Sequence, residues 1–343
     1  MLRWAIIGTG FISDTMATAI AASEGSRIEA AFGRDSGRLS DFVDRHRISK
    51  RYTDYDRLLS DPDIDVVYIG LPNNAHRDAV VKAAAKGKAI LSEKSLTTTM
   101  KDAELLADAV GSAGVFFLEG LMYLSHPLID KVGDILRSGC LGKIQSVTGS
   151  YAANIWQLAN PLGNGTIFNL GCYPVSLLQY VVQTACGPDA FVHRVASGIG
   201  NLSSHDGNIC DAALTVRFSN GVLATLQSTD SYGMSFDFAV YGDRGVLRFA
   251  TNPWLPVAGE NLLDLEHYDR ERQTIVVTSP HDAFRHQVMR VEECLRQGFT
   301  EAPRPSPRLS DSLEIMDLLT TWEKQCRVAI DTGSQTADRA SGV

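Results

Sequence analysis

Short apolar runs and longer amphipathic segments alternate along the first 120 residues. The apolar runs at residues 4–7, 64–71 and 89–92 are dominated by bulky side chains, as expected of strands buried on both faces. Segments with helical periodicity separate them, among them residues 39–46 and 77–86. Strands that alternate with helices in this way predict an α/β domain built on a parallel, doubly wound sheet.

The pattern changes in the second part of the chain. One helix is predicted over residues 126–138, another ends near residue 183, and two more close the chain at 283–297 and 310–330. Between them the sequence predicts strands over residues 144–152, 191–198, 212–218, 222–228, 236–241 and 245–249. These strands meet at hairpin-like turns and predict an α+β domain with an open, mostly antiparallel sheet. Such a sheet leaves one face free, which often forms a dimer surface.

The length of 343 residues fits two domains. We expect the first domain to cover residues 1–121 and the second to cover residues 122–333. Residues 334–343 are expected to form a frayed C-terminal tail.

Charge, hydropathy and cysteine content narrow the function classes. The net charge of -8 argues against general nucleic-acid binding, which favours a basic surface. No apolar run approaches the roughly 20 residues that span a bilayer, so no membrane association is expected. The six cysteines form no C-x-x-C pair and no metal-ligand spacing is present, so neither disulfides nor a metal site is predicted. The N-terminus enters a strand after one arginine and does not resemble a signal peptide, which favours a cytoplasmic location.

The strongest local signal is the turn Gly8-Thr9-Gly10, which follows the first strand and precedes a helix at residues 12–22. A dinucleotide fold needs such glycines for a tight turn and for close approach of the backbone to a pyrophosphate. The helix would direct its N-terminal N–H groups and its dipole at that phosphate. Ser13 stands where the third glycine of the fingerprint is usual, and it is small enough to keep the helix close to the strand. A plain strand–turn–helix without a ligand is the alternative.

The end of the second strand bears on the choice of cofactor. The strand at residues 27–32 is followed by Gly33, Arg34 and Asp35. NAD-specific folds usually place Asp or Glu here to bind the ribose 2′-OH, whereas a guanidinium can bind a 2′-phosphate. Arg34 therefore favours NADP. NAD stays possible because a small shift of register would bring Asp35 into the acidic position, and a solvated Arg34 is the alternative.

Two segments carry candidate catalytic groups. Lys94 follows a strand of the first domain, next to Glu93, at the edge where a nicotinamide should lie. It could protonate or orient a substrate oxygen during hydride transfer, or it could form only a surface ion pair with Glu93. Asn169 and Tyr173 lie four residues apart and share one helical face if the helix begins early, near residue 168 and not near residue 174. Tyr173 could donate a proton with Lys94 close by. A core tyrosine with a hydrogen-bonded hydroxyl is the alternative.

A third group of candidate residues lies at the predicted domain junction. It contains Glu119, Met122, Tyr123, His126 and Pro127. A lone histidine before a proline is more often structural than catalytic.

Together these motifs resemble the Gfo/Idh/MocA oxidoreductase family, named after glucose–fructose oxidoreductase and inositol dehydrogenase. Residues 8–12, 72–76 and 93–94 look like the cofactor domain of that family. Residues 119–127 are similar to its E-A-F-M-Y-R-x-H-P stretch, and residues 169–175 to its D-x-G-C-Y-x-V stretch. Both stretches are typical of the subgroup that contains dimeric dihydrodiol dehydrogenase and NADP-linked xylose dehydrogenase.

The resemblance implies a Rossmann domain followed by a sheet domain through which the protein forms a homodimer or homotetramer. It implies NAD(P)-dependent oxidation of a hydroxyl on a small-molecule sugar, polyol or dihydrodiol, or the reverse reduction. Lys94 matches the catalytic lysine, Tyr173 matches the position where many members have His, and Asn169 would orient the substrate. The implied cofactor-binding residues are Gly8, Thr9, Gly10, Phe11, Ile12, Gly33, Arg34, Leu71, Pro72, Asn73, His76, Glu93, Lys94 and Glu119.

Four positions depart from the family pattern. Ser95 replaces the proline of E-K-P, Asn169 replaces an Asp, Leu124 replaces an Arg, and Ser13 replaces the third glycine. The proline helps to fix a cis bond, and because a non-proline cis bond costs about 3 kcal/mol we expect the backbone at Ser95 to differ. A nucleotide-binding regulatory protein that kept the fold and lost turnover is the alternative function.

Overall fold

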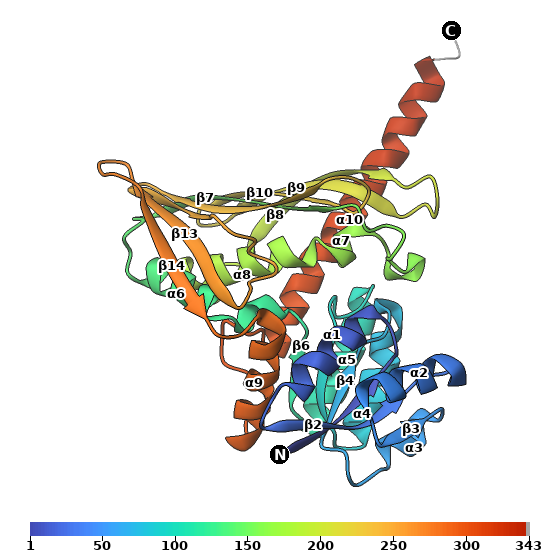
Figure 1. The fold of residues 1–343 in the computed structure, drawn as a ribbon. Helices are drawn as coiled ribbons and strands as arrows, with labels where there is room; N and C mark the ends of the chain where they lie inside the picture. Colours follow the sequence, from blue (N-terminus) through green and yellow to red (C-terminus); the bar gives the residue numbers. More distant parts are fainter. Residues whose placement is uncertain (341–343) are drawn as a thin grey trace. The chain divides into compact units, whose positions relative to one another are not determined.

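The computed structural model describes the backbone of residues 1–340 and the side chains of residues 1–331. The chain forms two compact units (Figure 1). The first contains Met1–His126 and His281–Leu313, and the second contains Pro127–Pro280 and the chain from Glu314 onwards.

The first unit is built on a six-stranded, wholly parallel sheet. Its strands are β1 (Leu2–Ile7), β2 (Ser26–Phe32), β3 (Lys50–Tyr52), β4 (Val66–Ile69), β5 (Ala89–Ser92) and β6 (Phe117–Glu119). Its helices are α1 (Phe11–Ala21), α2 (Ser36–His46), α3 (Tyr55–Leu59), η1 (Asn73–Ala75), α4 (His76–Ala85), α5 (Met100–Ala113), η2 (Met122–Ser125) and α9 (Ala283–Arg296). The strand order β3-β2-β1-β4-β5-β6 is that of a dinucleotide-binding sheet, so the predicted doubly wound fold is confirmed. Strand β3 was not predicted, because three residues are too few to show a period.

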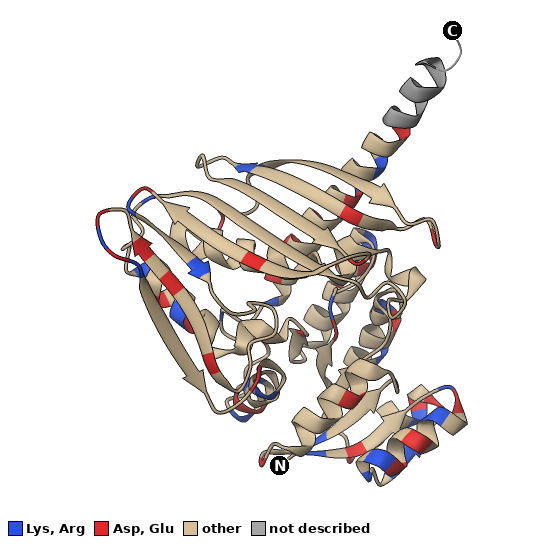
Figure 2. Cartoon of the chain, turned by 45° about the horizontal axis from the view of Figure 1, so that its top comes forward, with Lys and Arg blue, Asp and Glu red and all other residues tan. Residues whose placement is uncertain are grey.

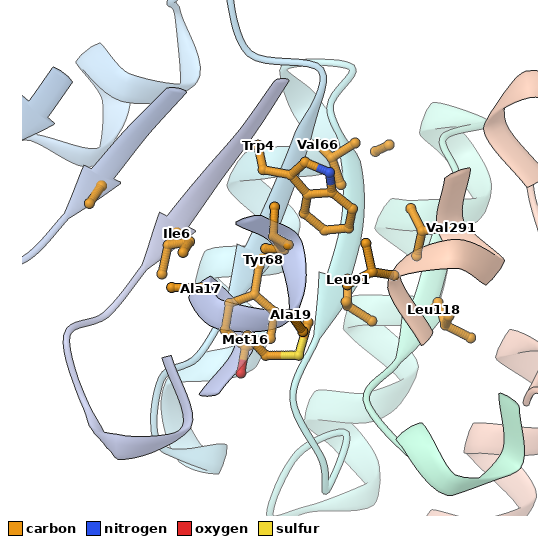
Figure 3. Packing of buried hydrophobic residues seen from close by; sticks show 14 of the residues in the cluster. Trp4, Ile6, Met16, Ala17, Ala19, Val66, Tyr68, Leu91, Leu118 and Val291 are labelled. Atoms are coloured by element: carbon orange, nitrogen blue, oxygen red, sulfur yellow. The ribbon is translucent and has the colours of Figure 1, made fainter. Parts of the chain in front are cut away.

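The first unit does not follow the predicted domain boundary, because residues 281–313 return to it. The prediction had placed all of residues 122–333 in the second domain. Val288 and Val291 of α9 are buried in the same hydrophobic cluster as Trp4 at the start of β1 (Figure 3). Helix α9 also packs against α1, so its apolar face covers the sheet of the first unit.

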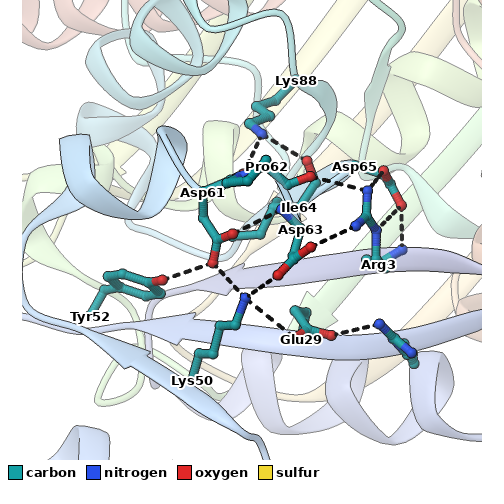
Figure 4. A network of polar contacts seen from close by, with 11 residues as sticks. Arg3, Glu29, Lys50, Tyr52, Asp61, Pro62, Asp63, Ile64, Asp65 and Lys88 are labelled. Atoms are coloured by element: carbon teal, nitrogen blue, oxygen red, sulfur yellow. Dashed lines mark hydrogen bonds and ion pairs between the residues drawn. The ribbon is translucent and has the colours of Figure 1, made fainter.

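A polar network closes the edge of this sheet opposite to the carboxyl ends of its strands (Figure 4). Lys50 Nζ lies 2.9 Å from the carboxylate of Asp61 and 2.8 Å from that of Asp63. Arg3 forms an ion pair with Asp63 at 3.0 Å, and the Tyr52 hydroxyl donates to Asp61 at 2.8 Å. Asp61 is buried whereas Asp63 is exposed, so only Asp61 is held in a largely dry environment.

The second unit is built on an eight-stranded sheet in the order β14-β13-β12-β11-β7-β10-β9-β8. Its strands are β7 (Ile144–Ala153), β8 (Arg194–Leu202), β9 (Ile209–Phe218), β10 (Leu223–Thr229), β11 (Met234–Gly242), β12 (Gly245–Phe249), β13 (Gly259–His267) and β14 (Gln273–Ser279). All neighbours are antiparallel except β7 and β10, which confirms the predicted sheet type. Strands β13 and β14 were not predicted.

Helices cover one face of this sheet and leave the other open. They are α6 (Pro127–Arg137), η3 (Pro161–Gly163), α7 (Thr166–Asn169), α8 (Cys172–Cys186) and the part of α10 (Leu309–Ala340) that follows Leu313. Helix α8 packs on β7 and β10, and Trp322 of α10 packs where a Cβ on Gly198 would lie only 2.7 Å from its ring. On the open face Ser197, Thr215 and Thr225 stand side by side in register across three strands. Figure 2 shows that most positions along these strands carry no charge.

The C-terminal helix is longer than predicted. Helix α10 continues to Ala340, past the predicted end at residue 330, so most of the predicted tail at 334–343 is helical backbone. Residues 341–343 lie outside the described residues.

Candidate functional site

The carboxyl ends of the parallel strands bring most of the predicted cofactor residues to one edge of the first unit. The turn after β1 contains Gly8, β2 is followed by Gly33, β4 by Leu71, β5 by Glu93, and β6 ends in Glu119. In doubly wound sheets ligands bind at this edge, beside the point where the strand order reverses. Here that point lies between β1 and β4, which are hydrogen-bonded neighbours.

The turn after β1 requires a glycine at position 8. Gly8 has a φ of 106°, and a Cβ there would lie 2.6 Å from the carbonyl oxygen of Gly70. Gly10 is the N-cap of α1 without a side-chain cap, and a Cβ on it would meet no atom within 4 Å. The first N–H groups of α1 therefore have no side-chain cap from Gly10 and can bind an anion such as a pyrophosphate. Phe11, which follows them, is 83% exposed although it is apolar.

Ser13 takes the place of the third glycine because a second glycine faces it. Ser13 is fully buried in α1, and a Cβ on Gly70 would lie only 2.5 Å from its hydroxyl oxygen. The missing side chain at Gly70 thus makes room for the serine. This supports the prediction that Ser13 permits close packing of the helix on the sheet.

The carboxylate that follows β2, that of Asp35, caps the next helix. Asp35 is the N-cap of α2, and its Oδ1 accepts hydrogen bonds from Gly37 N and Arg38 N, each at 2.9 Å. Arg34 is exposed and forms no ion pair with the residues that the structure describes. Arg38, also exposed, lies one helical turn later. Arg38 is not among the cofactor residues predicted from the sequence. The sequence could have indicated it, because an N-cap at Asp35 places Arg38 in the first turn of α2.

His76 joins the two loops that follow β4 and β5. It is fully buried, with Nε2 2.8 Å from the carbonyl oxygen of Leu71 and Nδ1 3.0 Å from that of Ser95. Burial lowers its pKa, while these carbonyl groups and that of Leu96 act in the opposite direction. The structure thus gives His76 a role in shaping the edge of the site, and its predicted contact with a cofactor remains a prediction.

Lys94 lies half-buried directly after β5. The preceding Glu93 is buried, accepts a hydrogen bond from the Tyr68 hydroxyl at 2.8 Å, and accepts a second from the Lys94 backbone N–H at 3.3 Å. The peptide bond between Lys94 and Ser95 is cis, so the expected difference in backbone at Ser95 is wrong. Glu93 is therefore buried in the interior, whereas the alternative prediction was an ion pair between Lys94 and Glu93 on the surface.

Glu119 closes the same edge at the end of β6. Its side chain is 1% exposed, and burial raises its pKa to about 7. The negative charge of Glu93 acts in the same direction, and the positive charge of Lys94 opposes it. Direct contact of Glu119 with a cofactor remains a prediction.

Asn169 and Tyr173 lie in the second unit, on two helices and not on one. Helix α7 ends at Asn169, and α8 begins at Cys172 after the break at Leu170 and Gly171. The shared helical face expected from their spacing of four residues is therefore absent. A Cβ on Gly171 would lie 2.6 Å from the carbonyl oxygen of Ile167, which explains why a glycine occupies this position between the two helices.

Tyr173 belongs to an aromatic cluster of the second unit. Its ring centroid lies 5.3 Å from that of Tyr151 in an edge-to-face arrangement and 6.2 Å from that of Trp254. Burial raises the pKa of Tyr151 to about 12. The cluster fixes the Tyr173 ring, which is 6% exposed, and leaves its predicted role as proton donor untested.

The third sequence cluster is part of the interior. Met122, Tyr123 and His126 are buried around η2, and the His126 ring packs edge-to-face on that of His286 at 4.9 Å. Among the described residues no group of three or more His, Cys, Asp or Glu side chains could hold a metal ion. None of the described helices is long and apolar enough to cross a membrane.

Two segments of the chain match the N-terminal and C-terminal domains of one protein family. Residues 2–121 match "Oxidoreductase family, NAD-binding Rossmann fold", and residues 129–248 match "GFO/IDH/MocA C-terminal domain". A trans-1,2-dihydrobenzene-1,2-diol dehydrogenase from Xenopus tropicalis is 25% identical over 329 residues, which covers 92% of this chain and 96% of the relative.

Solved structures share the fold over almost the whole chain. A 3-ketoreductase from Actinomadura kijaniata, in complex with TDP-benzene and NADP, has a TM-score of 0.81 at 24% identity, covering 95% of this chain and 97% of that one. A levoglucosan dehydrogenase, in complex with NADH and levoglucosan, has a TM-score of 0.79 at 17% identity with the same coverage. Both units of this chain therefore have counterparts with the same fold.

Proposed function

Because this chain belongs to the Gfo/Idh/MocA family and is an NAD(P)-binding oxidoreductase, we propose that it oxidises a hydroxyl group of a sugar, polyol or dihydrodiol, or reduces the corresponding carbonyl. The observation that carries the proposal is the position of Lys94. It stands at the end of β5, on the sheet edge that also bears the open turn at Gly8 and Gly10.

The first unit contains the groups that a dinucleotide needs. The uncapped start of α1 at Gly10 supplies N–H groups and a positive helix end for the pyrophosphate. The glycine at position 8 keeps the backbone close enough for this contact. When bound, the nicotinamide would supply the hydride acceptor or donor.

The end of β2 supports a preference for NADP. Gly33 leaves no carboxylate for a ribose 2′-OH, and the carboxylate of Asp35 is already the cap of α2. Arg34 and Arg38 would place two guanidinium groups beside the first turn of α2, where they can bind a 2′-phosphate.

Side chains of this protein would donate and accept the proton that accompanies hydride transfer. In the direction of reduction, the Lys94 ammonium donates a proton to the substrate oxygen and stabilises the negative charge that develops on it. Tyr173 is the second candidate donor, and the side-chain amide of Asn169 would hold the substrate hydroxyl. In oxidation the substrate hydroxyl would give its proton to the neutral Lys94 amine or to a Tyr173 phenolate.

The relatives support a cyclic substrate that carries hydroxyl or carbonyl groups. The Xenopus relative is named for a dihydrobenzenediol, and the levoglucosan dehydrogenase was solved with levoglucosan. A sugar or a dihydrodiol fits the same proposal, since both present neighbouring hydroxyl groups on a ring.

The experiment is a screen of sugars, polyols and dihydrodiols, read by the absorbance of the reduced nicotinamide. The wild type should turn over at least one class, and Lys94→Ala should lower kcat by roughly 10²-fold or more while cofactor binding is kept. Unchanged turnover in the variant would remove Lys94 from the mechanism. No turnover across the whole panel, together with tight cofactor binding, would favour the regulatory protein instead.

The open face of the eight-stranded sheet supports self-association. Val195 and Ile199 of β8 are 74% and 64% exposed on this face, in register with Arg217 and Ala213 of β9. A second copy of the chain would cover these apolar side chains in a homodimer, or in a homotetramer built from such dimers.

A further inference from the structure

Two glutamates, Glu93 and Glu119, lie at the ends of the neighbouring strands β5 and β6. Ser92 at the end of β5 pairs with Glu119 at the end of β6, and Gly120 N donates to Ser92 O at 2.6 Å. A Cβ on Gly120 would lie 3.1 Å from Glu93 Cα and 3.3 Å from its carboxyl carbon. The missing side chain at Gly120 therefore lets the Glu93 carboxyl group pack against the strand end that carries Glu119.

The two carboxyl groups differ in their partners. Both are buried, at 6% exposed for Glu93 and 1% for Glu119. Glu93 has the Tyr68 hydroxyl at 2.8 Å as a donor. Neither oxygen of Glu119 has a hydrogen bond of standard geometry to the described residues; the Ser312 hydroxyl and the Leu96 backbone favour its ionised form only in part. An ionised carboxylate without strong donors is costly in the interior, so Glu119 is the one of the two that favours the neutral form.

We propose that Glu119 is the proton store of the Lys94 site: it holds a carboxyl proton in the resting protein and returns it to Lys94 after each turnover. This rests on the proposed role of Lys94. In reduction, an Nζ–H bond of Lys94 breaks as the O–H bond of the product forms. The O–H bond of Glu119 then breaks as the Nζ–H bond forms again, and the Glu119 carboxylate takes a proton from water. Glu119 acts through Lys94 and does not touch the substrate.

The charges around Glu119 fit this role. Burial and, to a smaller extent, the Glu93 charge raise the pKa of Glu119, while Ser312, Leu96 and Lys94 lower it, and the net pKa is about 7. Burial also raises the pKa of Glu93, against the effects of Lys94 and Tyr68. The charges of Glu93 and Lys94 thus act on the proton affinity of Glu119, and the Ser312 hydroxyl at the start of α10 favours its ionised form. A proton that leaves Lys94 changes the proton affinity of Glu119.

The first test is an infrared pH titration of the substrate-free protein. A protonated carboxyl band should persist at pH 6 and disappear with a midpoint near 7, and Glu119→Gln should remove it. Asp230 needs a control, because burial raises its pKa to about 6, so the titration is repeated in Asp230→Asn. A Glu119 band that disappears near the ordinary carboxyl pKa of about 4 would overturn the proposal.

The second test measures coupling to Lys94. Lys94→Met removes a positive charge that favours the carboxylate, so the Glu119 midpoint should rise by about 1 pH unit or more. Ser312→Ala leaves the carboxyl group in place, removes a hydroxyl that favours the ionised form, and should also raise the midpoint. The Ser312→Ala variant still tests the proposal if Glu119→Gln does not fold. An unchanged midpoint in Lys94→Met would overturn the coupling.

The third test is the pH profile of turnover. Glu119→Gln should lower kcat and remove the dependence on pH near 7, with KM little changed, whereas a merely structural role would leave the shape of the profile as it is. The infrared measurements need no substrate. If Glu119 is ionised in a protein whose turnover depends on Lys94, only this inference fails. If no substrate of the screen is turned over, only the proposed function fails.

Discussion

The sheets of the two units are covered by helices in different ways. In the first unit helices cover both faces of a parallel sheet, and polar groups can gather only where its strands end. In the second unit helices cover one face, and the other keeps exposed side chains along whole strands such as β8. The first arrangement places polar groups in short loops at the strand ends, whereas the second leaves side chains exposed at alternate positions along a strand such as β8.

This difference also separates the chemistry. The first unit carries the candidate cofactor site and Lys94, and its key residues directly follow strand ends. The second unit carries Asn169 and Tyr173, which are set by a helix break at Gly171 and by an aromatic cluster. The predictions below test whether the units divide the work in this way.

The largest effect should come from Tyr173→Phe in the second unit. Loss of a proton donor should lower kcat by roughly 10²-fold or more, with cofactor binding unchanged. Tyr151→Phe is the matched control, because its ring lies 5.3 Å from that of Tyr173 in the same cluster. Steady-state kinetics of both variants is the measurement. Equal losses in the two would assign the effect to packing of the cluster and not to the Tyr173 hydroxyl.

The open sheet face should respond strongly to charge. Val195→Asp combined with Ile199→Asp places two carboxylates on an apolar part of the face and should shift the protein from oligomer to monomer in sedimentation velocity. Leu105→Asp is the control, since Leu105 is an exposed apolar residue of α5 in the first unit. An oligomer that survives the double variant would exclude this face as the interface.

A smaller effect is expected from Arg34→Ala at the end of β2. Loss of a charge-assisted contact with a 2′-phosphate should weaken NADPH binding by roughly tenfold to 100-fold and leave NADH binding nearly unchanged. Fluorescence titration with both cofactors measures this. Arg51→Ala is the control, because Arg51 is exposed on β3 and its guanidinium binds the Ser40 hydroxyl. Equal weakening for both cofactors would separate Arg34 from the 2′-phosphate.

The smallest effect should be on stability, at the opposite sheet edge of the first unit. Backbone and side-chain donors, above all Asp63 N, Lys50 and Tyr52, outweigh burial and lower the pKa of Asp61 from 3.8 to about 2. The ionised form thus stabilises the fold above about pH 4, and this contribution is lost as the pH falls from about 4 to about 2.

Asp61→Asn should therefore lower the free energy of unfolding at pH 7 by up to roughly 2 kcal/mol, a difference that shrinks below pH 4. Denaturant titrations at pH 7 and below pH 4 measure this difference in the free energy of unfolding. Asp63→Asn is the control; it binds the same Lys50, but its side chain is 53% exposed, so the change should be much smaller. A pH-independent difference would contradict the assigned role of the Asp61 charge.

The sequence by itself determined the family, the two sheet types and the main candidate residues. Runs such as residues 4–7 are local signals, because a strand buried on both faces is apolar throughout. The turn at Gly8 is equally local, since its positive φ favours glycine over other residues. The hairpin-like turns of the second part predicted an antiparallel sheet, which leaves one face open.

Only the tertiary structure decided which distant residues meet. Helix α9 returns to the first unit because Val288 and Val291 complete its core, and no local pattern states where an apolar helix face will pack. Ser13 fits because Gly70 faces it, and His76 joins the loops at Leu71 and Ser95.

The environment of Glu119 is of the same kind. Its proton affinity depends on burial and on Glu93, Lys94 and Ser312, the last more than 190 residues away along the chain. Desolvation and charge interactions depend on distance in space and not on position along the chain. A sequence pattern can therefore point to a glutamate at a strand end, but only the folded chain decides whether that glutamate keeps its proton.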